Sequence, residues 1–275
     1  RNIRQHFINS SNKTELNRAI KEGESVAKII EPLGLPSEIM ASAIIYPLFR
    51  EKIIKIKDIK NIYLQDISKY ILGLDQLNQF SLPYNWKPGE SLAIHQSEAL
   101  RKMLLAVVSD VRLVLVRIAE QLFRLREAKK APDSVKQSLS IETREIYAAL
   151  ANRLGVWQLK WELEDYAFRY SNPDSYLKIA KLLKEKRAER ESFIDNMKSS
   201  LQVELETNGI IAKVSGRPKH IYSIWRKMHL KNRGLESLYD IRAVRILVQD
   251  VNECYAALGI VHNLWPYIPG EFDDY

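Results

Sequence analysis

The sequence has 275 residues, enough for two domains, and its 46% hydrophobic and 28% charged residues are typical of globular proteins. It contains no apolar run of about eighteen residues and no apolar segment near its start, so we expect a cytoplasmic protein without membrane contact. The single cysteine excludes an intrachain disulfide and a zinc site built on several thiolates. The net charge of +8 suits an anionic partner such as a nucleotide or RNA, although surplus lysine is also common on solvated surfaces.

The first part of the chain has the periodicity of helices. From Glu15 to about Leu125 apolar residues recur at helical spacing, which predicts an all-helical domain over residues 1–170. Proline and glycine predict breaks at Pro32–Pro36 and in the segment 81–90. A further loop is expected around residues 129–138.

Two more helices are expected before the pattern changes. Ser140 is a plausible N-cap for a helix that ends at Gly155, and a further helical segment reaches the break at Asn172-Pro173. One long helix is predicted from Tyr176 to Thr207, within a connecting segment over residues 171–209.

The last part of the chain alternates strands and helices. The pattern predicts strands at 210–215 and 240–248 and helices at 218–231 and 251–265. Residues 210–275 therefore indicate an α/β domain, and the sequence stops before the further strands that such a sheet needs. Cys254 is expected to be a buried residue of the last helix.

Positive charge is concentrated between Gly216 and Arg233, which include six Lys or Arg residues and no Asp or Glu. Pro218 fits the first turn of a helix, and the free N–H groups of a helix N-terminus attract phosphate. Arg217 precedes that helix and could bind phosphate or stack on a base. Three phosphate-seeking side chains would then share one helix face: Lys219, Ser223 and Lys227. The alternative is a solvated basic face.

Carboxylates accompany this basic segment. Asp240 stands just before the second strand, where it could hold Mg²⁺ or could instead cap a turn. Glu271, Asp273 and Asp274 offer either metal or substrate contacts or merely a turn.

Long segments of the sequence resemble the RelA/SpoT family. They are GRPKHIYSIWRKM, LYDIRAVRILV, CYAALGIVH and PGEFDDY, with ANRLGVWQLKWELEDYAFRY upstream. The resemblance implies a nucleotidyltransferase-like synthetase, which transfers pyrophosphate from ATP to the 3′-hydroxyl of GDP or GTP and releases AMP. The product, guanosine tetra- or pentaphosphate, is the signal of the stringent response.

The resemblance also implies roles for individual residues. Arg217 and Arg245 would bracket the adenine, while Lys219, Ser223 and Lys227 would hold the ATP phosphates and Asp240 would bind Mg²⁺. Asp240, Arg217 and Lys219 are the predicted catalytic residues. Strict strand alternation puts Asp240 and Arg245 on opposite faces, so a bulge, or an Asp240 outside the strand, is required.

The acidic tail resembles the EXDD form of family members that only synthesise. Glu271, Asp273 and Asp274 occupy its acidic positions. The guanosine-binding residues of the family would lie beyond Tyr275. We therefore expect a truncated synthetase domain that does not catalyse the reaction alone.

The helical domain resembles the family's hydrolase domain, of the HD superfamily, which holds manganese with His, His-Asp and a distant Asp. In this sequence those places are taken by Glu22, by Tyr46 and Pro47, and by Glu120. Arg50 and Glu51 stand where an acidic catalytic pair would be, and Arg50 would repel a cation. This predicts a degenerate pseudo-hydrolase without Mn²⁺, in which Ile44–Leu48 is core helix. A hydrolase with another metal set, for instance His95 with nearby acids, is the alternative.

The sequence as a whole therefore predicts a multidomain protein and part of a monofunctional synthetase that binds ATP and GTP or GDP. The resemblance further implies that the complete protein contacts the ribosome and uncharged tRNA through regions absent from this chain. The alternative is a catalytically dead module that binds nucleotide or ribosomal RNA. Asp240 and the acidic tail favour the enzyme, because carboxylates weaken RNA binding.

Overall fold

A computed structural model describes residues 13–62, 65–79, 98, 102, 110–185, 187–217, 220–231, 243–268 and 274. The chain divides into two compact units, Arg1–Pro173 and Asp174–Tyr275, which we call unit 1 and unit 2. Each is described by itself. Among the described residues, no helix combines the length and the apolar character that a membrane span requires.

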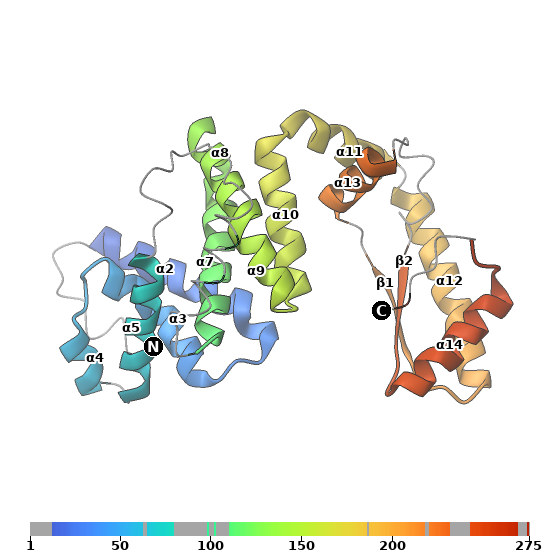
Figure 1. Ribbon diagram of the computed structural model, residues 1–275, viewed down its shortest axis with the longest axis horizontal. Helices are drawn as coiled ribbons and strands as arrows, with labels where there is room; N and C mark the ends of the chain where they lie inside the picture. Colours follow the sequence, from blue (N-terminus) through green and yellow to red (C-terminus); the bar gives the residue numbers. More distant parts are fainter. Residues whose placement is uncertain are drawn as a thin grey trace. The chain divides into compact units, whose positions relative to one another are not determined.

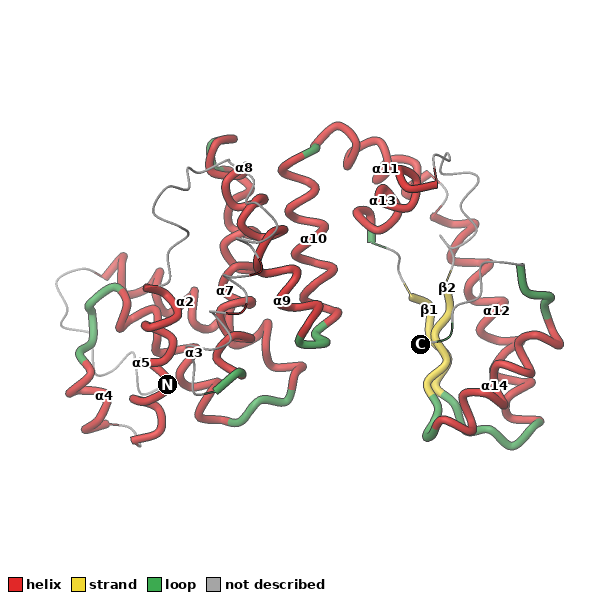
Figure 2. The backbone as a smooth tube through the Cα atoms, in the orientation of Figure 1, coloured by secondary structure: helices red, strands yellow, loops and turns green. Residues whose placement is uncertain are grey.

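Unit 1 is helical throughout its described part, as the periodicity predicts (Figures 1 and 2). Its α-helices are α2 (Lys13–Ile30), α3 (Ser37–Arg50), α4 (Ile56–Ile62), α5 (Gln65–Gln79), α7 (Arg112–Glu127), α8 (Asp133–Glu142), α9 (Ala148–Arg153) and α10 (Trp157–Ser171).

The core of unit 1 forms where α2, α3, α5 and α7 pack together. The segment Ile44–Leu48 lies inside α3, and Tyr46 and Leu48 are almost completely buried, which confirms the predicted core helix. Gly23 allows α2 to approach α3 closely, because an added Cβ would lie 2.8 Å from the Cα of Ile44. These contacts fix the relative positions of α2 and α3.

The predicted break at Pro32–Pro36 is confirmed. A 3₁₀ turn at Glu31–Leu33 ends at Gly34, whose φ of 63° lies in the left-handed region that favours glycine. The predicted break at Asn172-Pro173 is also confirmed, because α10 ends at Ser171. The segment 81–90 lies outside the described residues.

The prediction that Ser140 is an N-cap is wrong. Helix α8 begins at Asp133, inside the predicted loop, and continues through Ser140 into a π-helical turn at Thr143–Tyr147 and then α9. The hydroxyl of Ser140 donates to the carbonyl of Lys136 at 2.8 Å, so the side chain is satisfied within the helix. Gly155, with φ of 72°, follows the end of α9 as expected.

Unit 2 combines helices with a two-stranded sheet (Figure 1). Its elements are α11 (Pro173–Glu185), α12 (Arg187–Thr207), β1 (Lys213–Arg217), α13 (Ile221–Lys231), β2 (Ala243–Leu247) and α14 (Val251–Leu264). The main apolar cluster lies between α12, α14 and one face of the sheet, where Leu201, Leu205 and Ala257 are buried.

The long helix predicted over 176–207 is described as α11 and α12, which are separated only by residue 186, outside the described residues. They belong to different apolar clusters. Ile179 of α11 packs against Ile224 of α13, whereas Leu201 and Leu205 of α12 pack against the sheet and α14. The apolar residues of this segment therefore pack against two partners: those of α11 against α13, and those of α12 against the sheet and α14.

Cys254 is exposed, which corrects the prediction that it is buried. It lies in the first turn of α14, next to the N-cap Asp250, whose carboxylate accepts the N–H of Glu253. Burial in α14 begins further along the helix, at Ala257. The first turn of α14 is thus accessible to solvent.

Candidate functional site

The two strands of unit 2 bring together the positions of two predicted adenine contacts. β1 and β2 are antiparallel, with Ser215 opposite Arg245 and Arg217 opposite Ala243. Since alternate residues of a strand share a face, positions 217 and 245 are diagonal neighbours on one face. β1 begins at Lys213, later than the predicted 210, while β2 lies within its predicted range.

The other face of the sheet is covered by α12. Val214, Val244 and Ile246 belong to the apolar cluster there. Gly216 sits where α12 comes close, because an added Cβ would lie 2.8 Å from the Cγ2 atom of Ile194. The glycine of the GRPKH segment therefore has a packing role.

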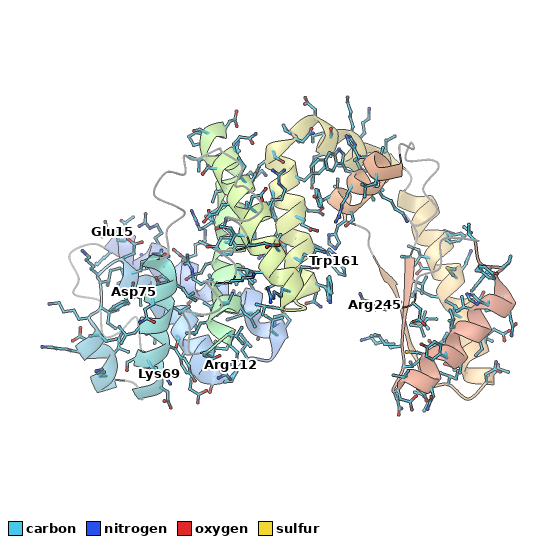
Figure 3. All side chains as sticks on the ribbon, viewed as in Figure 1. Glu15, Lys69, Asp75, Arg112, Trp161 and Arg245 are labelled. Carbon is cyan, nitrogen blue, oxygen red and sulfur yellow. The ribbon has the colours of Figure 1, made fainter. Side chains whose placement is uncertain are left out.

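Arg245 projects from the face turned away from α12 and α14 (Figure 3). Its side chain is exposed and makes no ion pair with another described residue. We call this side of the ribbon, with positions 213, 215, 217, 243, 245 and 247, the outer face. It offers a guanidinium to an anionic or aromatic ligand.

Helix α13 follows β1 but begins at Ile221, three residues later than predicted. The N–H of Ile224 donates to the carbonyl of His220 at 3.1 Å, which marks the first turn. Ser223 and Lys227 lie one turn apart on α13, and both are half-buried. Pro218 and Lys219 lie outside the described residues.

A second face of α13 carries aromatic rings. The centroids of Tyr222 and Trp225 are 5.8 Å apart, and those of Trp225 and His229 are 4.6 Å apart. Trp225 also packs onto the cluster shared with α11. This contact orients α13, because it fixes which side of the helix faces α11.

The acidic residues of the predicted site are mostly outside the described residues, namely Asp240, Glu271 and Asp273. Asp274 is described, and it accepts a hydrogen bond from the hydroxyl of Tyr255 at 3.1 Å. That hydrogen bond, together with the negative charge of Asp274, raises the pKa of Tyr255. The contact links Asp274 to α14.

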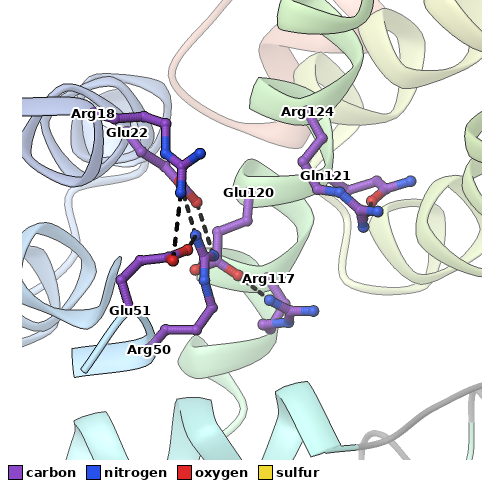
Figure 4. A network of polar contacts seen from close by, with 8 residues as sticks. All are labelled: Arg18, Glu22, Arg50, Glu51, Arg117, Glu120, Gln121 and Arg124. Atoms are coloured by element: carbon purple, nitrogen blue, oxygen red, sulfur yellow. Dashed lines mark hydrogen bonds and ion pairs between the residues drawn. The ribbon is translucent and has the colours of Figure 1, made fainter. Parts of the chain in front are cut away.

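In unit 1, the positions aligned with the hydrolase site form a cluster of charged residues (Figure 4). Arg50 donates to both carboxylate oxygens of Glu22, at 2.8 and 2.9 Å, and to Glu51 at 3.2 Å. Arg18 approaches the other oxygen of Glu51 at 3.4 Å. The Arg50–Glu22 pair is a two-bond fork, the geometry that suits guanidinium and carboxylate best.

Glu120 is the most deeply buried acid of this cluster. It pairs with Arg117 one turn away on α7, and its second oxygen, Oε1, has no hydrogen-bond partner among the described residues. Burial raises the pKa of Glu120, against the lowering effect of Arg117 and Arg50. The hydroxyl of Tyr46 is likewise buried without a partner in the described part of the chain.

These residues do not fit a manganese ion. Both oxygens of Glu22 are engaged by Arg50, Pro47 has no donor side chain, and Glu120 is paired with Arg117. Burial raises the pKa of Tyr46 above its ordinary value, so its hydroxyl stays protonated. Among the described residues, no group of three His, Cys, Asp or Glu side chains is placed to hold a metal ion. His95 lies outside them.

Sequence reasoning missed Arg117 and a polar network beside it. Gln121 donates to Thr143 at 2.9 Å and accepts from Arg124 at 2.9 Å, while Arg124 pairs with Glu142 at 3.5 Å. The three-residue spacing of Arg117 and Glu120 on a predicted helix was the available signal, because such residues are neighbours on a helix surface.

Comparison with protein families agrees with the two units. Residues 2–157 match the HD domain, and residues 216–275 match the region found in RelA/SpoT proteins. The first match spans the larger part of the chain, which is therefore an HD-domain protein.

With both regions in this order, the chain belongs to the RelA/SpoT family. The GTP pyrophosphokinase of Photobacterium angustum is 42% identical over 253 residues, which cover 92% of this chain and 34% of the relative. The GTP pyrophosphokinase of Escherichia coli K12 is 41% identical over 260 residues, with the same coverage. The guanosine-3′,5′-bis(diphosphate) 3′-pyrophosphohydrolase of Aquifex aeolicus is 34% identical over 252 residues, 91% of this chain and 35% of the relative. The chain thus spans about a third of the length of these relatives.

Proposed function

We propose that unit 2 carries the ATP-binding part of a GTP pyrophosphokinase. The complete enzyme would transfer the pyrophosphoryl group of ATP to the ribose 3′-hydroxyl of GDP or GTP, with AMP as the leaving group. The observation that carries this proposal is the register of β1 and β2, which makes positions 217 and 245 diagonal neighbours on the outer face. The names of the relatives from Photobacterium angustum and Escherichia coli support the same reaction.

Each group would act by positioning and by neutralising charge. Arg245, exposed on the outer face, would stack on the adenine with Arg217. Ser223 and Lys227 of α13, with Lys219 before the helix, would bind the phosphates. Pyrophosphoryl transfer needs in-line placement and charge stabilisation more than covalent help from the protein, so such a set suffices on the ATP side.

Asp240 is the proposed ligand of Mg²⁺, which would neutralise the phosphate charge. In the protein extended beyond Tyr275, Asp240→Asn should abolish synthesis while ATP binding is largely kept. Unchanged synthesis in this variant would refute the magnesium assignment.

The adenine assignment is tested with Arg245→Ala in the extended protein. Lys213→Ala is the matched control, because Lys213 is an exposed cation on the same face, diagonal to position 245 but on the side away from position 217. Loss of a stacking guanidinium should lower kcat/KM for ATP on the order of tenfold, and Lys213→Ala should change it little. Transfer of labelled phosphate from ATP to GTP measures both. Equal losses that depend steeply on salt would indicate a general anion-binding surface instead.

We also propose that unit 1 has no pyrophosphohydrolase activity, since its residues at the aligned positions do not form a metal site. The chain should not hydrolyse guanosine tetraphosphate in the presence of Mn²⁺. The Aquifex aeolicus relative, which is named as a hydrolase, is the positive control. Clear turnover that Glu22→Gln abolishes would overturn this part of the proposal.

A further inference from the structure

The charged cluster of unit 1 joins three helices, of which α7 is far from α2 and α3 in sequence. Arg18 and Glu22 come from α2, Arg50 ends α3 with Glu51 next to it, and Arg117 and Glu120 come from α7. Three positive and three negative side chains meet there, so the cluster is electrically balanced without any added ion.

Arg50 is at the centre of this cluster. Its guanidinium binds Glu22 and Glu51 directly, and Glu120 on α7 points toward the same group in Figure 4. The exposed fractions of the Arg50 and Glu22 side chains are 25% and 12%, against 66% for Arg18. Among the described residues of this cluster, Arg50 alone contacts acids from two segments in a partly buried setting, since Glu22 lies on α2 and Glu51 follows α3.

We propose that the guanidinium of Arg50 is the built-in cation of unit 1, which neutralises the carboxylates between α2, α3 and α7 and makes the unit independent of divalent metal. The resemblance to HD-superfamily hydrolases implies a metal ion at this place, and here the chain supplies a cation covalently. This goes beyond the absence of hydrolysis, because an inactive site could still bind a metal and depend on it for stability.

The positions of Glu22 and Arg50 explain why the guanidinium can take the place of a metal ion. Glu22 precedes Gly23, at which α2 meets the backbone of α3, so the carboxylate of the Arg50–Glu22 fork comes from a residue next to this helix contact. A metal ion would have to take the two oxygens of Glu22 from Arg50 and would meet the positive charges of Arg50 and Arg117. Burial lowers the pKa of Arg50, but the hydrogen bonds and charge of Glu22 outweigh it and raise the pKa, so the cation is permanent.

Thermal unfolding of the 275-residue chain tests the proposal first without any substitution in unit 1. The chain carries Asp240→Asn, which removes the proposed Mg²⁺ ligand of unit 2, so that an effect of a metal ion reports on unit 1. The midpoint Tm, followed by circular dichroism, should be the same with EDTA, with Mn²⁺ and with Mg²⁺. Electron paramagnetic resonance should show that Mn²⁺ stays free in the presence of the protein. A rise in Tm with Mn²⁺ that disappears in Glu22→Gln would overturn the proposal.

Substitutions then test Arg50 itself. Arg50→Met leaves Glu22 without a cation and should lower Tm by roughly 5–10 °C. Arg18→Met, the matched control, removes an exposed guanidinium from the same cluster and should lower Tm by no more than about 2 °C. Arg50→Lys keeps the charge but not the fork, so its Tm should lie between those of Arg50→Met and the wild type. Equal effects of Arg50→Met and Arg18→Met would refute a special role for Arg50.

A double-mutant cycle distinguishes the direct interaction between Arg50 and Glu22 from a general destabilisation of α3. Because Glu22→Gln removes the charge that Arg50 neutralises, Arg50→Met combined with Glu22→Gln should lose less Tm than the sum of the two single variants. Additive losses would contradict direct coupling. If Arg50→Met does not fold, Arg50→Lys with Glu22→Gln provides the same comparison.

Discussion

The hydroxyl of Tyr46 lies in the core of unit 1, and no described residue hydrogen-bonds to it. A buried hydroxyl without a partner keeps its desolvation cost, so Tyr46→Phe, which retains the ring, should raise the free energy of unfolding by about 1 kcal/mol. Urea denaturation measures the change. Tyr170→Phe is the matched control, because the hydroxyl of Tyr170 donates to the carbonyl of Leu125 at 2.8 Å and its removal should cost about 1 kcal/mol. Destabilisation by Tyr46→Phe would show that this hydroxyl is satisfied in solution.

Asp110 gives the stability of unit 1 an acid-sensitive component. Its carboxylate accepts hydrogen bonds from the guanidinium and the backbone N–H of Arg112, and chiefly the first of these lowers its pKa. The folded pKa is then below the unfolded value of about 3.9, so the carboxylate stabilises the fold above that pH and stops doing so as pH falls through the folded pKa.

The substitution Asp110→Asn should therefore lower the free energy of unfolding at neutral pH. Its difference from the wild type should shrink as pH falls below about 4, because protonation neutralises the wild-type carboxylate as well. Urea denaturation across this range provides the measurement. The control Asp133→Asn removes an almost fully exposed carboxylate and should show a small difference at every pH. A constant difference for Asp110→Asn would contradict the lowered pKa.

Among the helices, the contact between α2 and α3 depends on the absence of a side chain at Gly23. The Cβ of an alanine at position 23 would lie 2.8 Å from Cα and 2.9 Å from the carbonyl carbon of Ile44, and backbone cannot move aside as a side-chain end can. Gly23→Ala should therefore destabilise unit 1 by about 3 kcal/mol by forcing the helices apart. Gly259→Ala in α14 is the control, because its Cβ meets nothing within 4 Å, and it should be neutral or stabilising. Similar denaturation midpoints for the two variants would disprove the close contact.

Periodicity predicted the elements that have one packing partner. β2 and α14 lie within their predicted ranges, because each shows one apolar face to the cluster around Leu201. It failed where a polar residue is satisfied inside a helix, as Ser140 is.

The candidate sites were predictable only in part, for a related reason. The basic segment is local in sequence, but the shared face of positions 217 and 245 depends on strand register, which spacing alone does not give. The Arg50–Glu22 fork joins residues 28 positions apart. The sequence therefore predicts only that Arg50 repels a metal ion, whereas in the structure Arg50 also binds Glu22, the acid at an aligned metal position.

At the scale of the whole molecule, the two units differ in how much core they contain. The large apolar cluster extends from Leu16 to Tyr170 and is formed by residues of unit 1 alone. The described clusters of unit 2 contain few fully buried residues, among them Ile224 and Leu205. Since burial of apolar surface is the main stabilising term, unit 1 has the stronger basis for folding by itself.

A chain that ends at Pro173 should accordingly unfold in one cooperative thermal transition, with the Tm of the corresponding transition of the 275-residue chain. Arg50→Met should lower its Tm by as much as it does in the longer chain, because the described acids that Arg50 contacts, Glu22 and Glu51, lie in unit 1. The complementary piece, residues 174–275, should unfold at a lower temperature and less cooperatively, since its clusters are small. Circular dichroism and calorimetry on the three chains make the comparison. If the 1–173 chain shows no cooperative transition, the core of unit 1 is insufficient by itself and depends on residues after Pro173.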